Sequence, residues 1–186
     1  MRILMCAAAL RQESSNKKLI KVAATLAKNA QHDVDVASFS DFMLPIYDGD
    51  VEEKQGIPEV AKQFAIRMQQ AQALIIASPE YNHSIPGTLK NLIDWVSRIS
   101  PMPWRNQYIL LLSASPSVVG GNRGLWATRI PLEYCGSFVY PDMFSLANSY
   151  QAFDQNNQLS DAKTHARLEQ LLMSFIAHTG QCGSKS

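Results

Sequence analysis

The stretch ALIIASPEYNHSIPG, residues 73–87, contains the features that decide the fold. Its first six residues, 73–78, form a nearly unbroken apolar run. Such runs are typical of strands in a parallel sheet, which helices cover on both faces. A polar segment bounded by prolines follows at once, and residues 86–99 then change to helical spacing. The stretch therefore predicts a buried strand, a rigid loop and a helix, in that order.

The same alternation extends over the rest of the chain. Apolar spacing predicts further strands at 2–8, 34–39, 108–115 and 137–141, and further helices at 14–30, 58–70, 122–135 and 160–178. Residues 40–57, with Pro45, Gly49 and Gly56, are predicted to form a loop. Alternating elements predict an α/β fold with a doubly wound parallel sheet. Five strands favour a flavodoxin-like three-layer sandwich of strand order 2-1-3-4-5 over the six-stranded dinucleotide-binding order.

Composition narrows the classes of function. The chain has 186 residues, 46% of them hydrophobic and 18% charged, which predicts one domain over residues 1–180 and a flexible tail over 181–186. A net charge of +1 argues against a nucleic-acid partner. The apolar start reads as a first strand rather than a signal peptide, and no run approaches the length that spans a membrane. Three scattered cysteines and dispersed histidines predict no metal site, and a cytoplasmic protein.

In a sheet of this kind, ligands bind beyond the carboxyl ends of the strands, so three loops are informative. The first loop, residues 8–16, leads into a helix N-terminus, where free amides attract anions. Arg11, Ser14 and Asn16 can donate hydrogen bonds to phosphate oxygens there. The loop contains neither a P-loop motif nor GxGxxG. An ordinary capped helix with a surface arginine is the alternative.

The second loop, residues 78–87, is stiffened by two prolines and is rich in polar residues. Pro79, Glu80, Tyr81 and Asn82 suit a planar heterocycle with many acceptors, with Tyr81 against the ring and Asn82 donating to a ring carbonyl. Glu80 is expected to accept hydrogen bonds from the loop. A rigid turn without a ligand is the alternative.

The third loop, residues 113–124, is rich in small residues. Ser115, Gly120 and Gly121 would let the edge of a flat ligand approach the backbone. A flexible connection between strand and helix is the alternative.

Together, the three loops resemble those of the NADPH-dependent FMN reductase family, which includes quinone, chromate and azo-dye reductases. The family's second loop is similar to P-E-Y-N-x-S-x-P-G-x-L-K-N-x-I-D-W, and residues 79–95 read PEYNHSIPGTLKNLIDW. Residues 44–48, LPIYD, are similar to the family's loop after the second strand. The resemblance covers nearly the whole chain and implies that FMN is the cofactor.

The first loop departs from the family pattern G-S-x-R-x-x-S-x-N. Arg11, Ser14 and Asn16 match, but Ala8 and Ala9 stand where the family has Gly and Ser. The lost hydroxyl removes one phosphate donor, which contributes about 1 kcal/mol in a typical hydrogen bond. The sequence therefore predicts either that FMN binds more weakly than is usual in the family or that the flavin exchanges.

The resemblance implies an FMN-dependent oxidoreductase. NADPH or NADH would deliver hydride to the flavin, which would reduce a quinone, metal-oxyanion, azo or free-flavin acceptor, with backbone amides of residues 80–82 stabilising the reduced ring. This chemistry requires no catalytic side chain, and His83 is interpreted as a solvated or packed residue. The rival functions are a flavodoxin-like electron-transfer protein and a flavin-binding sensor without NADPH turnover.

The family commonly forms dimers or tetramers, so the resemblance also implies a homodimer or homotetramer. The aromatic loop around Tyr47 and the segment 95–105, with Trp104, are the predicted contacts.

Overall fold

The computed structural model describes residues 1–183 and confirms the alternation of strands and helices. Most predicted elements lie within one to three residues of their expected bounds. The elements are β1 (Arg2–Ala7), α1 (Ser15–Asn29), β2 (Asp33–Ala37), the 3-10 helix η1 (Phe39–Phe42), α2 (Gly49–Gln55), α3 (Glu59–Gln69), β3 (Ala73–Ala77), α4 (Gly87–Ser97), β4 (Tyr108–Ala114), α5 (Asn122–Tyr134), β5 (Phe138–Val139), β6 (Phe144–Leu146) and α6 (Ala162–Gly183).

The strands form one parallel sheet in the order β2-β1-β3-β4-β5, which confirms the flavodoxin-like order. A sixth strand, β6, was not predicted. It continues the same edge, because β5 pairs with Tyr108 and Ile109 of β4 while β6 pairs with residues 112–114. The predicted strand at 137–141 is therefore too long. Pro141, which has no N–H to donate to a strand ladder, lies between the two short strands.

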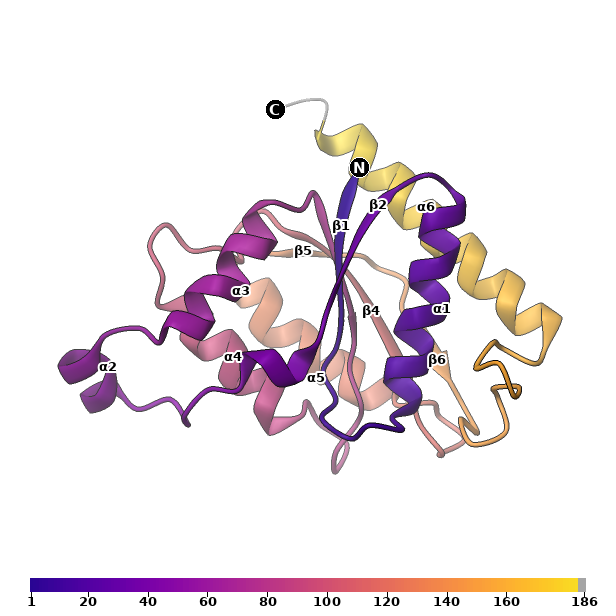
Figure 1. Ribbon diagram of the computed structural model, residues 1–186, viewed down its shortest axis with the longest axis horizontal. Coiled ribbons are helices and arrows are strands. Elements are labelled where there is room, and N and C mark those ends of the chain that lie inside the picture. The colour runs from indigo at the N-terminus through magenta and orange to yellow at the C-terminus, as the bar shows by residue number, and fades with distance from the viewer. Residues whose placement is uncertain (184–186) are drawn as a thin grey trace.

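Two apolar cores lie on the two faces of the sheet, and Figure 1 shows the three resulting layers. Helices α3, α4 and α5 cover one face, and α1 and α6 cover the other. Side chains of β1 alternate between them: Leu4 and Cys6 join the first core, and Ile3 and Met5 join the second. Both faces are covered, which explains the unbroken apolar run of β3.

Two predictions on the periphery need correction. Residues 49–55, predicted as loop, form the short helix α2, which has no buried residue and projects from the body in Figure 1. The sequence feature that marks the start of this helix is its N-cap, Asp48, whose side chain accepts a hydrogen bond from the N–H of Asp50 at 2.8 Å. At the other end of the chain, α6 continues through residues 181–183 of the predicted tail, while 184–186 lie outside the described residues. No helix within the described part is long and apolar enough to cross a bilayer.

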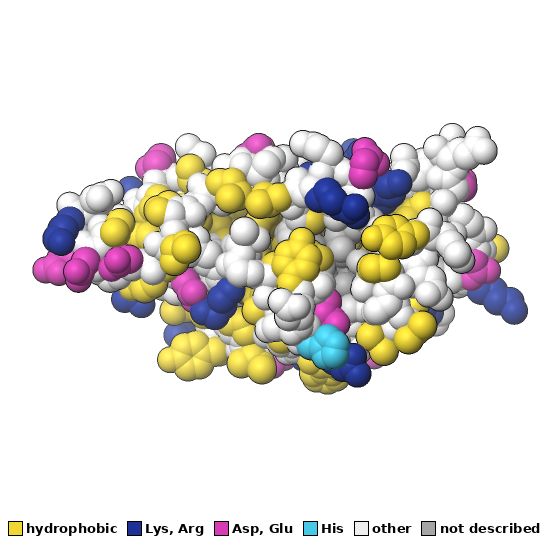
Figure 2. All heavy atoms as spheres, turned by 90° about the horizontal axis from the view of Figure 1, so that it is seen from below, with side chains coloured by type: hydrophobic (Ala, Val, Ile, Leu, Met, Phe, Trp, Pro, Cys, Tyr) yellow, Lys and Arg dark blue, Asp and Glu magenta, His cyan; other side chains and the backbone are white. Residues whose placement is uncertain are grey.

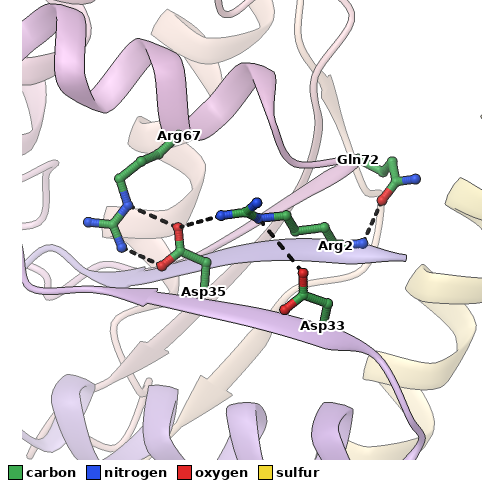
Figure 3. Close-up of polar contacts among 5 residues, drawn as sticks. All are labelled: Arg2, Asp33, Asp35, Arg67 and Gln72. Atoms are coloured by element: carbon green, nitrogen blue, oxygen red, sulfur yellow. Dashed lines mark hydrogen bonds and ion pairs between the residues drawn. The ribbon is translucent and has the colours of Figure 1, made fainter.

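A network of charged residues fastens one edge of the sheet to α3 (Figure 3). The guanidinium of Arg67 donates through two nitrogens to the carboxylate of Asp35 on β2, one of these hydrogen bonds measuring 2.9 Å. Arg2 lies within 3.9 Å of the carboxylates of both Asp35 and Asp33, and its backbone N–H donates to the side chain of Gln72. The network joins β1, β2, α3 and the segment that enters β3.

The thiol of Cys6 is fully buried in β1, and this burial has a consequence at high pH. Burial raises the pKa of Cys6 from its ordinary value of 9.0 to about 12, and the nearby positive charge of Arg67 offsets part of the increase. Below pH 9 the thiol is protonated in the folded and unfolded chains alike, so its contribution to stability is fully present. Between pH 9 and 12 only the unfolded chain ionises, so that contribution is lost as pH rises.

We therefore expect the free energy of unfolding to fall with pH more steeply in the wild-type chain than in Cys6→Ala. The difference in slope should be about 1 kcal/mol per pH unit above pH 9. Urea titrations at pH 8.5, 9.5 and 10.5 would measure it. Because the two chains share every other titrating group, parallel curves would contradict this account.

Candidate functional site

A cavity of about 400 Å³ lies at the carboxyl edge of the sheet, where the predicted loops meet. Figure 2 shows this edge from below, with a hollow between apolar side chains and a basic side chain at its rim. A cavity of about 420 Å³ at the opposite edge shows that volume does not identify the site, so the chemistry of the lining must. The lining residues are Arg11, Ser14, Ser15, Asn16, Pro79, Glu80, Tyr81, Ala114, Ser115, Pro116, Ser149 and Tyr150.

The structure brings seven of the ten predicted site residues together around this cavity. They are Arg11, Ser14, Asn16, Pro79, Glu80, Tyr81 and Ser115. The other three, Asn82, Gly120 and Gly121, are absent from its lining among the described residues. The positions follow from the sheet, because β1, β3 and β4 are neighbours and their carboxyl ends share one edge.

The N-terminus of α1 gives one end of the cavity the character of an anion site. The buried side chain of Ser14 caps the helix by accepting from the N–H of Asn16 at 3.3 Å. The first amides of a helix have no partner within it, and they attract negative charge. Within the described residues, Arg11 makes no ion pair, so its guanidinium remains available. The nearby Glu13 pairs with Lys18 at 3.9 Å.

Asn16 fixes the wall of the cavity. Its buried side chain donates to the carbonyl of Ala114 at 2.9 Å and accepts from the N–H of Ala114 at 2.9 Å. These two hydrogen bonds hold the start of α1 against the end of β4, although the two are distant in the sequence. The structure thus shows a positioning role for Asn16, and its predicted role as a phosphate donor stays a prediction.

The loop after β3 is a tight hairpin. The N–H of Tyr81 donates to the carbonyl of Ser84 at 3.1 Å, and the N–H of Ser84 donates back at 3.0 Å. Asn82 and His83 form the turn with φ of 51° and 60°, the left-handed pair that a two-residue hairpin requires. Both residues are exposed, and among the described residues Asn82 is absent from the cavity lining, where we expected it. Among residues 1–183, the N–H groups of Glu80 and Asn82 have no acceptor, whereas that of Tyr81 is occupied by the hairpin.

Glu80 is a structural residue, as predicted, although its donor differs from the expected one. Its carboxylate accepts from the N–H of Gly124 at 2.8 Å, in the first turn of α5 rather than in its own loop. A Cβ on Gly124 would lie 2.9 Å from that of Glu80, so the glycine permits the contact. The negative charge therefore faces a helix N-terminus, which stabilises it.

Gly120 and Gly121 are predicted to admit the edge of a ligand, and the structure shows a packing role for both. Both glycines are buried with positive φ, and they admit neighbouring parts of the protein. A Cβ on Gly120 would lie 2.9 Å from backbone atoms of residues 145–147. A Cβ on Gly121 would lie 2.1 Å from the hydroxyl oxygen of Ser113. The pair shapes the third loop around β6 and β4.

Sequence reasoning missed the segment after β6, which contributes Ser149 and Tyr150 to the lining. Ser149 is 2% exposed, and its hydroxyl is one of two buried side-chain groups without a hydrogen-bond partner among the described residues. The ring of Tyr150 stands at the rim and is largely exposed. No pattern in residues 147–151 marks them as functional, because only the pairing of β6 with β4 brings them to the cavity.

The LPIYD and KNLIDW segments, which carried part of the resemblance, are held together by hydrogen bonds. Asn91 of α4 accepts from the N–H of Tyr47 at 2.8 Å and donates to the carbonyl of Pro45 at 2.8 Å. Trp95 donates to the same carbonyl at 2.8 Å. The prediction that Trp104 forms a subunit contact is wrong, because its side chain is fully buried and its ring N–H donates to Ile93.

Comparisons with known proteins identify the family of the chain. The model of the NADPH-dependent FMN reductase family matches residues 1–151. The quinone reductase of Escherichia coli strain K12 is 36% identical over 119 residues, which are 63% of each chain, so the match spans under two thirds of that relative. The NAD(P)H:quinone oxidoreductase of Solanum tuberosum is 31% identical over 171 residues, 90% of this chain and 87% of that protein.

Solved structures support the fold. The flavoenzyme NAD(P)H:(acceptor) oxidoreductase FerB from Paracoccus denitrificans has a TM-score of 0.81 at 24% identity, and the match covers 97% of each chain. The matching family is described as NADPH-dependent FMN reductase. Because the family model covers 151 of the 186 residues, the chain belongs to the NADPH-dependent FMN reductase family.

Proposed function

We propose that the protein is an FMN-dependent oxidoreductase that passes hydride from NAD(P)H through bound FMN to a small-molecule acceptor. The observation that carries the proposal is one cavity that joins the anion-binding N-terminus of α1 to the hairpin after β3. Quinones are the acceptor class we favour, because the relatives reported above are named quinone reductases. Metal oxyanions, azo compounds and free flavin remain the other candidate acceptors.

The donors around the cavity fit a flavin phosphate at one end. Arg11, the hydroxyl of Ser14 and the first amides of α1 offer a positive, hydrogen-bonding cradle for a phosphate monoester. Bound FMN would supply the hydride chemistry, and the protein would orient it and exclude competing reactions.

The hairpin after β3 would hold the ring end of FMN. The N–H groups of Glu80 and Asn82, which have no acceptor among the described residues, can stabilise negative charge on a reduced ring. The exposed Tyr81 lines the cavity beside them. The carboxylate of Glu80 is turned toward α5, which keeps its charge from opposing the ring's. No side chain has to transfer a proton for hydride to move.

Steady-state assays test the proposal. With added FMN and a quinone, the purified chain should oxidise one NADPH for each quinone reduced. Repeating the assay with NADH in place of NADPH would establish which electron donor the protein prefers. Bound FMN without NADPH oxidation would contradict the proposal and favour the electron-transfer or sensor alternative. A series of acceptors at saturating NADPH would rank quinones against the other classes.

We also propose that the protein is a homodimer or homotetramer and that it works in the cytoplasm, where its three free thiols would stay reduced. Helix α5 offers an apolar face that supports association. Trp126, Ile130 and Tyr134 follow one another at four-residue spacing and are 57%, 71% and 90% exposed. Exposed apolar stripes of this kind commonly mark contacts between proteins.

Placing a charge in this stripe should separate the subunits. We expect Ile130→Glu to convert the wild-type oligomer into a monomer, because a buried unpaired carboxylate is costly. Ile66→Glu, at an exposed isoleucine on α3, is the matched control and should keep the wild-type mass. Light scattering during size-exclusion chromatography measures both variants. A monomeric wild-type chain at micromolar concentration would overturn the proposal.

A further inference from the structure

We propose that the hydroxyl of Ser149 binds the ribityl-phosphate chain of FMN, which makes the segment after β6 a fourth cofactor-binding loop. This inference rests on the proposed function and adds a residue to its site. It begins from an unusual feature: Ser149 lines the cavity, is 2% exposed, and its hydroxyl has no partner within residues 1–183. Buried polar groups in folded proteins are nearly always hydrogen-bonded, so each exception calls for an explanation.

The backbone around Ser149 is held firmly, so its buried hydroxyl would reach a ligand in the cavity by rotation of the side chain alone. The N–H of Ser149 donates to the carbonyl of Ser115 at 3.1 Å, and the N–H of Asn148 donates to the carbonyl of Ser117 at 3.3 Å. Asn148 has φ of 48°, a left-handed conformation that turns the chain toward the cavity edge. The segment is thus fastened to the third loop immediately before Tyr150.

The glycines of the third loop contribute to the same arrangement. Gly120 packs against the backbone of residues 145–147, so closely that a Cβ would lie 2.9 Å away. The N–H of Ser115 donates to the carbonyl of Leu146 at 3.0 Å. We infer that the glycine-rich loop serves the cofactor indirectly, by letting β6 approach β4 and bring Ser149 to the cavity.

The neighbours of Ser149 in the lining identify the chemistry that it would recognise. Arg11, Ser14 and Ser15 line the same cavity and offer a positive charge, hydroxyls and helix amides. A ligand that satisfies all of them carries several oxygen acceptors, as a phosphate on a polyhydroxyl chain does. A flavin ring also carries acceptors, but the positive charge of Arg11 and the amides of α1 in the same lining favour the phosphate-bearing chain as the partner of Ser149.

The second unpaired hydroxyl, that of Ser113, provides a matched control. Ser113 is also fully buried, but it lies outside the cavity lining and faces Gly121. Ser149→Ala and Ser113→Ala therefore remove the same group from similar surroundings. Because neither hydroxyl has a partner among residues 1–183, both variants should be at least as stable as the wild type without FMN.

The experiment measures FMN affinity by fluorescence quenching and unfolding by urea, for the full-length wild type and both variants. We expect Ser149→Ala to raise the dissociation constant about fivefold, the effect of one buried hydrogen bond, and Ser113→Ala to change it by less than about twofold. A loss confined to FMN would assign the contact to the phosphate, and an equal loss with riboflavin would assign it to the ribityl hydroxyls. Either result supports the inference.

Two outcomes would overturn it and are distinguishable. If the wild type binds FMN and Ser149→Ala binds it equally well, the Ser149 assignment fails while the proposed function stands. If the wild type binds no FMN, the proposed function fails and the assignment fails with it. Lower stability of Ser149→Ala without FMN would also contradict the inference, because it would reveal a structural partner for the hydroxyl.

Discussion

Arg11→Ala is expected to weaken FMN binding by about ten- to a hundredfold. The reason is that a hydrogen bond between charged groups contributes about 1.5 to 3 kcal/mol, and each 1.4 kcal/mol corresponds to tenfold in affinity. Arg11 lines the cavity beside the N-terminus of α1 and has no ion-pair partner among the described residues, so its whole charge is available to a phosphate. Its removal should leave the stability of the FMN-free protein unchanged within about 0.5 kcal/mol.

Two comparisons separate a phosphate contact from a general effect of charge. Riboflavin, which lacks the phosphate, should bind the wild type and Arg11→Ala equally. Lys62→Ala removes a positive charge from a surface ion pair with Glu59, outside the cavity lining, and should leave FMN affinity unchanged. An equal loss of riboflavin and FMN affinity in Arg11→Ala would show that Arg11 does not bind the phosphate.

Gly121→Ala is expected to lower the free energy of unfolding by about 2 to 5 kcal/mol. Gly121 has φ of 82°, where a side chain costs about 1 to 2 kcal/mol, and its new Cβ would lie 2.1 Å from the hydroxyl oxygen of Ser113. Relieving that overlap in a packed interior costs typically another 1 to 3 kcal/mol. Urea unfolding followed by circular dichroism measures the effect.

Two further variants test the cause. Gly49→Ala, at the start of α2, has nothing within 4 Å of the new Cβ and should be neutral or slightly stabilising. Adding Ser113→Ala to Gly121→Ala removes the oxygen at 2.1 Å but leaves the positive φ, so it should restore part of the lost stability. If Gly121→Ala unfolds at the wild-type urea concentration, the close packing of the third loop is contradicted.

The core of the fold could be predicted from the sequence because its signals are local and repeated. The apolar run of residues 73–77 and the helical spacing that follows each mark a buried element, and their alternation limits the topology. The weak elements were missed for equally physical reasons. Helix α2 has seven residues and no buried face, and β6 has three residues after the break at Pro141. Neither element therefore shows a regular spacing of apolar residues that would identify it.

The location of the site could be predicted from the sequence, but the roles of several of its residues could not be. The order of strands places the first three loops at one edge, which is why Arg11, Tyr81 and Ser115 meet. Whether a glycine admits a ligand or a neighbouring strand depends on partners distant in the sequence, such as residues 145–147 for Gly120. The same holds for Ser149, whose unpaired hydroxyl is visible only once β6 is placed beside β4.

Equilibrium titration of the purified protein with FMN, followed by absorption and by quenching of flavin fluorescence, tests whether the cavity binds FMN. Because Ala8 and Ala9 replace the family's Gly and Ser, some flavin is expected to dissociate during purification, and added FMN should restore full occupancy. We expect saturable binding of one FMN per chain and an oxidised-flavin spectrum that NADPH bleaches. A colourless protein that leaves the fluorescence of added FMN unchanged would contradict this expectation.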